Sequence, residues 1–118
     1  MLVATMQIQV HTDHNIDGHE KLAAWVTGVL EQSLGAVQDR ISHVEVKLRD
    51  ENGGKKNGTD DMRCAIEARI EGRGPVAVTG QATTIHEAVT SASDKLARLI
   101  DHTLERIADR NAETQHRW

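Results

Sequence analysis

The sequence lacks several groups that particular functions need. It contains no Phe or Tyr and two Trp, so it offers no aromatic platform for stacking single-stranded nucleic acid. Cys64 is the only cysteine, which excludes an intramolecular disulfide and fits a reducing cytoplasm. No run of about 18 apolar residues is present, so we expect no membrane-spanning helix. The N-terminal residues lack the charged region of a signal peptide, and we expect none.

The balance of charge is acidic, with a formal net charge of −4 and seven His side chains. A net acidic chain has no general attraction for nucleic acid, so a site of that kind depends on where the basic residues lie. A length of 118 residues suits one domain with a modest core. We expect that domain over residues 1–110 and a polar, disordered tail over 111–118.

Hydrophobic periodicity predicts the order strand, helix, strand, strand, strand, helix. Strands with alternating apolar residues are predicted at 6–11, 41–49, 62–71 and 76–83, and a polar hairpin loop at 50–61. The first helix is predicted at 17–34, with Asp17 as N-cap, Gly28 allowing close contact with the second helix, and Gly35 ending it. Because one sheet face is apolar, both helices should cover that face of a four-stranded mixed sheet. The predicted class is α+β.

The second helix is predicted over 84–110 and carries two stripes. Thr84 and Glu87 have the spacing of a capping box at its start. An apolar stripe follows at steps of three and four, formed by Ile85, Val89, Ala92, Leu96, Leu99, Ile100 and Ile107. Beside it runs a basic stripe of Lys95, Arg98, His102 and Arg106. The alternatives for the basic stripe are a binding surface or a solvated face with salt bridges to Asp94, Asp101, Glu105 and Asp109.

Other polar groups have similar alternatives. Basic residues on the open sheet face are expected to pair across strands with Glu45 and Glu67, or to bind a partner; they are Lys47, Arg49, Arg63 and Arg69. Lys55 and Lys56 belong to a solvated loop or reach a phosphate. The polar group at the first strand-to-helix turn has too irregular a spacing for a metal site, so we expect no metal; it comprises His11, Asp13, His14 and His19.

The remaining candidates favour packing rather than chemistry. Cys64 alternates with apolar residues and is expected in the core, and Trp25 is expected to pack at the edge of the first helix. Gly72 and Gly74 belong to a hairpin turn and not to a nucleotide fingerprint. No arrangement suggests a nucleophile with a base, paired catalytic carboxylates or a cofactor site. We therefore predict that the chain is not an enzyme and uses no cofactor.

Two stretches resemble a known family. The stretch 12–17 is similar to the strand, basic pair, Ile and acidic cap of the ribosome hibernation-promoting factor and protein Y family, also called sigma-54 modulation proteins. The stretches 85–89 and 94–99 resemble the helix entry and Asp-Lys-Leu core of the same family. Because we expect no second domain after Arg110, the resemblance is to the short form. The fold it implies also resembles a double-stranded-RNA-binding domain.

The resemblance implies a bacterial, cytoplasmic translation inhibitor that responds to stress. Such a protein binds the small ribosomal subunit in the mRNA and tRNA channel through rRNA phosphates. The residues expected to bind rRNA are Lys95, Arg98, His102, Arg106, Arg63, Lys47 and His14. This sequence has fewer bases than the family pattern, with His14-Asn15 in place of the basic pair. The alternative is a protein–protein interaction module of the same fold without ribosome binding; a monomer is preferred in either case.

Overall fold

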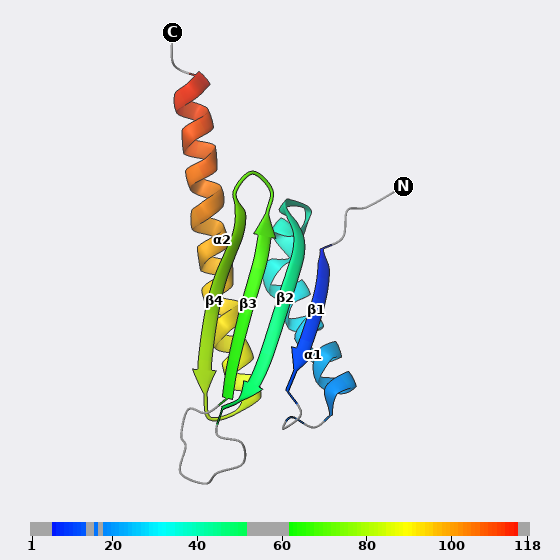
Figure 1. The fold of residues 1–118 in the computed structure, drawn as a ribbon. Coiled ribbons are helices and arrows are strands. Elements are labelled where there is room, and N and C mark those ends of the chain that lie inside the picture. Colours follow the sequence, from blue (N-terminus) through cyan, green and yellow to red (C-terminus); the bar gives the residue numbers. More distant parts are fainter. Residues whose placement is uncertain (1–5, 14–15, 17, 52–61, 116–118) are drawn as a thin grey trace, which may run out of the picture.

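The computed structural model describes residues 6–13, 16, 18–51 and 62–115, the last five by their backbone alone. The elements follow the predicted order with one added 3-10 helix, η1 (Figure 1). Their bounds are β1 Gln7–Thr12, α1 His19–Leu34, η1 Gly35–Arg40, β2 Ile41–Asp50, β3 Met62–Ile70, β4 Gly74–Ala82 and α2 Ile85–Gln115. No helix in the described part is long and apolar enough to span a membrane.

The four strands form one mixed sheet in the order β1-β2-β3-β4. β1 runs parallel to β2, and β3 and β4 extend the sheet through antiparallel pairs. Both helices cover the same face, with α2 over β3 and β4 and α1 beside it (Figure 1). The predicted α+β class, order of elements and covering of one sheet face by both helices are therefore confirmed.

The core lies between this face and the two helices. It includes the alternating residues of β2 and β3, among them Val44, Val46, Cys64 and Ile66. Each of these four residues exposes at most 1% of its surface. Burial raises the pKa of the Cys64 thiol to about 12, because the thiolate would lose its hydration. These residues are buried because alternate side chains of a strand point to one face, and only that face is apolar.

Packing between the sheet and α2 depends on one glycine. A Cβ added at Gly80 would lie 2.5 Å from the backbone oxygen of Ala88 and 2.7 Å from the backbone nitrogen of Ala92. The absence of a side chain at Gly80 therefore allows the backbone of α2 to lie directly on β4. The predicted close contact at Gly28 is wrong, since a Cβ there would meet nothing within 4 Å. Trp25 instead links the helices, with its ring centroid 4.4 Å from that of His86.

Several predicted helix ends differ from the structure. α1 begins at His19, with Gly18 in the left-handed conformation (φ 72°) as its N-cap; Asp17 lies outside the described residues. Gly35 has right-handed helical angles and continues the chain into η1 instead of ending it as a left-handed cap. α2 continues past Arg110 to Gln115, because this stretch contains good helix formers such as Ala and Glu and no Gly or Pro.

Candidate nucleic-acid interface along α2

The start of α2 is set by a reciprocal pair of hydrogen bonds. The backbone nitrogen of Glu87 donates to Oγ1 of Thr84 at 3.1 Å, and that hydroxyl donates to Oε1 of Glu87 at 3.1 Å. The first bond confirms Thr84 as the N-cap of α2. The second bond differs from that of a capping box, because Glu87 accepts from the hydroxyl of Thr84 and not from its backbone nitrogen. With the start of the helix set and its apolar stripe on the sheet, the rotation of the helix determines which side chains reach solvent.

The basic stripe of α2 is exposed along its whole length. Lys95, Arg98, His102 and Arg106 all lie on the solvent side of the helix. Nζ of Lys95 donates to the backbone oxygen of Thr79 at 2.8 Å, and Thr79 belongs to β4, the edge strand of the sheet. The stripe therefore starts at this sheet edge and follows α2 toward its C-terminal end.

The acidic residues between these bases do not neutralise them. His102 is the member of the stripe with an ion-pair contact, 3.7 Å from Nδ1 to Oε2 of the exposed Glu105. Lys95, Arg98 and Arg106 form no ion pair with any residue that the structure describes. The described side chains therefore do not form the alternative arrangement, a solvated face closed by salt bridges. The three positive charges of Lys95, Arg98 and Arg106 remain available to a ligand.

A cleft of about 450 Å³ lies at the C-terminal end of this stripe. The residues that line it are Gly72, Arg73, Leu99, His102, Thr103, Arg106, Ile107 and Arg110. The tight turn between β3 and β4 forms one wall, where Gly72 (φ 85°) and Gly74 (φ 97°) adopt positive φ angles. Arg73 was not among the predicted binding residues, because its place between two glycines indicated only a turn. The available signal was a basic residue between two turn glycines.

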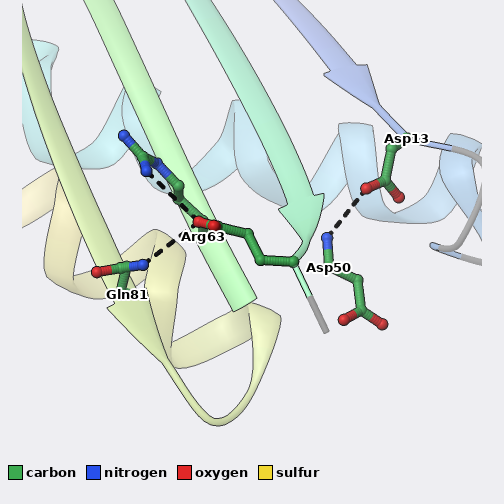
Figure 2. Close-up of polar contacts among 5 residues, drawn as sticks. Asp13, Asp50, Arg63 and Gln81 are labelled. Atoms are coloured by element: carbon green, nitrogen blue, oxygen red, sulfur yellow. Dashed lines mark hydrogen bonds and ion pairs between the residues drawn. The ribbon is translucent and has the colours of Figure 1, made fainter. Parts of the chain in front are cut away.

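The basic residues predicted on the sheet lie on the face away from the helices. Lys47 and Arg63 are therefore separated from the α2 stripe by the sheet itself. Nη1 of Arg63 lies 3.4 Å from Oε1 of Glu51, which also accepts a hydrogen bond from Nε2 of Gln81 at 3.3 Å (Figure 2). The structure thus places these candidates on a second surface.

The predicted cross-strand pairing on this open face is wrong. The register places Glu45 opposite Glu67 and Arg49 opposite Arg63, so like charges face each other. This arrangement is unfavourable in itself, and Glu45 turns instead to Nε2 of His11 at 3.3 Å. The periodicity assigned each residue to the correct face but not to its partner.

The polar residues near the start of α1 have separate partners. Nδ1 of His19 lies 2.7 Å from Oγ1 of Thr12. Oδ2 of Asp13 accepts a hydrogen bond from the backbone nitrogen of Asp50 at 3.1 Å, which joins the ends of β1 and β2 (Figure 2). His14 and the lysines of the loop 52–61 lie outside the described residues. Within the part of the chain described, no three His, Cys, Asp or Glu side chains are grouped as a metal site would require.

The sequence of this chain matches one protein family over most of its length. The family model described as sigma 54 modulation protein / S30EA ribosomal protein matches residues 8–108, which is most of the chain. The chain belongs to this family. The family consists of ribosome-associated modulation factors and is a non-enzymatic class, so the chain is not an enzyme. No curated protein matched the sequence.

Solved structures share the fold of this family member. The N-terminal domain of Thermus thermophilus Protein Y is 20% identical, with a TM-score of 0.64 over 83% of this chain and 99% of that domain. A ribosomal subunit interface protein from Coxiella burnetii is 14% identical, with a TM-score of 0.62 over 85% of this chain and 99% of that protein. At these identities the likeness establishes the fold alone.

Proposed function

We propose that this chain binds the small ribosomal subunit through rRNA phosphates in the mRNA and tRNA channel and keeps idle ribosomes inactive. The observation that carries the proposal is the α2 stripe, in which Lys95, Arg98 and Arg106 are exposed and form no ion pair with any described residue. Family membership supports a ribosomal partner. The protein would act in the bacterial cytoplasm, as a monomer with one domain over residues 1–110.

The chemistry of the stripe suits a phosphate backbone. Lys and Arg bind phosphates through charge and hydrogen bonds without reading the base sequence, and each neutralised phosphate releases a counterion. The residues of the stripe differ in what phosphate binding costs them. Lys95 already donates a hydrogen bond to Thr79 and must break it to reach a phosphate. Arg98 has no such bond to lose, so we expect it to contribute more than Lys95.

Co-sedimentation with purified ribosomes across a salt series tests this proposal. Arg98→Ala should weaken binding and reduce the slope of log affinity against log salt by about 0.7–0.9. Asp101→Lys should tighten binding, because the present carboxylate opposes a nearby phosphate. The matched control is Arg69→Ala, which removes the same charge from the exposed open sheet face.

Two results would contradict the proposal. One is the absence of the protein from the ribosomal pellet even at low salt, which would favour the interaction-module hypothesis. The other is equal binding by wild type, Arg98→Ala and Asp101→Lys, which would exclude the α2 stripe as the contact surface. A loss in Arg69→Ala that equals the loss in Arg98→Ala would show a nonspecific effect of net charge.

A further inference from the structure

The cleft between α2 and the β3–β4 turn has a composition that differs from that of the whole chain. It is lined by Arg73, His102, Arg106 and Arg110, and none of the lining residues that the structure describes is acidic. This is unexpected in a chain with 18 acidic and 14 basic residues. The acidic residues of the same half of α2 are absent from the lining; they are Asp101, Glu105 and Asp109.

The turn holds Arg73 in place opposite the helix. Its backbone nitrogen donates to the backbone oxygen of Ile70 at 3.1 Å, and positive φ angles at Gly72 and Gly74 close the turn around it. A Cβ at Gly72 would lie 4.0 Å from Cδ1 of Ile107, so the turn packs directly against α2. Basic side chains from the β3–β4 turn and from α2 thus border one cleft, and they can bind an anion from two sides.

The cleft also has apolar surface. Leu99 and Ile107 line it and are only partly buried, so they present hydrocarbon beside the guanidinium groups. Its volume of about 450 Å³ falls in the range of about 300–1,000 Å³ typical of small-ligand sites. A bare phosphate would use the charges and leave this surface unused. A nucleotide would use both, with its phosphate on the arginines and its sugar or base on the apolar side chains.

We infer that this cleft is a binding site for a nucleotide phosphate, with Arg73 and Arg106 as the principal anion ligands. The nucleotide can be free in solution or part of an RNA chain, because the recognising chemistry is the same. This inference goes beyond ribosome binding, since the cleft is complete within this chain. It adds Arg73, from outside the α2 stripe, to the residues that bind phosphate.

A titration without ribosomes tests the site. Backbone amide NMR of the full chain, titrated with adenosine 5′-monophosphate, should show saturable shifts at Gly72, Arg73 and Gly74. Arg73→Ala should weaken this binding by about tenfold, because a charge-assisted contact to the phosphate is lost. Arg69→Ala is the matched control, since it removes an exposed arginine from the open sheet face and not from the cleft. Adenosine without phosphate should bind much more weakly than the monophosphate.

Sedimentation with ribosomes then distinguishes the two sources of the nucleotide. If rRNA supplies it, Arg73→Ala should weaken pelleting and adenosine 5′-monophosphate should compete with the ribosome. If a free nucleotide is the ligand, the monophosphate binds as described while Arg73→Ala pellets like wild type. Both outcomes support the site. Shifts that are absent, or equal in wild type and Arg73→Ala, would overturn it without affecting the proposal for the α2 stripe.

Discussion

Gly80→Ala is the substitution that the structure predicts to be most damaging for its size. The single added methyl group would lie 2.5 Å from the oxygen of Ala88 and 2.7 Å from the nitrogen of Ala92. Both are backbone atoms inside α2, so no side chain can rotate away to make room. Relief requires the helix to move off β4, which would also disturb the hydrogen bond from Lys95 to Thr79.

The expected cost follows from this geometry. Overpacking a core costs typically about 1–3 kcal/mol, and a rigid backbone neighbour places this site at the upper end. A loss of about 3 kcal/mol is a large part of a total stability of about 5–15 kcal/mol. Gly28→Ala provides the matched control, because it makes the same chemical change where no atom lies within 4 Å. Since Gly28 lies inside α1, its replacement should stabilise the protein by up to about 1 kcal/mol.

Urea unfolding followed by far-ultraviolet circular dichroism measures both variants. The two midpoints should move in opposite directions from wild type, with similar slopes if both transitions are two-state. A Gly80→Ala variant as stable as wild type would refute the close packing of α2 on β4. A destabilised Gly28→Ala variant would refute the assignment of open space at α1.

Three further predictions concern the core and the cap. Ile66→Asp should unfold the domain, because a buried unpaired carboxylate costs several kcal/mol of stability. Glu67→Lys on the exposed face of β3 should leave the melting temperature nearly unchanged. Equal melting temperatures for the two variants would show that the wrong face of β3 was assigned to the core. The pKa of Cys64, raised by burial to about 12 from an ordinary value of 9.0, means that the native thiol stays protonated. It should therefore react with thiol reagents only through unfolding, and stability should fall as pH rises from 9 toward 12, because the unfolded state loses its proton first; rapid modification of the native protein at pH 8 would contradict this. Thr84→Ala should lower the free energy of unfolding by about 1 kcal/mol, because it removes the N-cap bond of α2. Thr90→Ala is the control in the same denaturation assay, since the hydroxyl of Thr90 bonds to the backbone oxygen of His86 within the helix.

Local patterns in the sequence determined the elements, their order and the core. Alternation from Met62 to Ile70 assigned one face of β3 to the core, because the side-chain period of a strand is two. The spacing of Thr84 and Glu87 located the start of α2, because an N-cap bond involves only neighbouring residues. The same helical period identified the exposed basic stripe, which is the main part of the candidate site.

Contacts between distant segments were decided by the tertiary structure alone. Alternation gives the face of a residue but not its partner, and only the register of β2 against β3 shows that Glu45 lies opposite Glu67. Gly28 and Gly80 look alike in the sequence, yet only the packing of α2 on β4 makes one of them essential. Arg73 joins the site for the same reason. No local pattern links it to Arg106, and they border one cleft because the β3–β4 turn packs against α2 at Ile107.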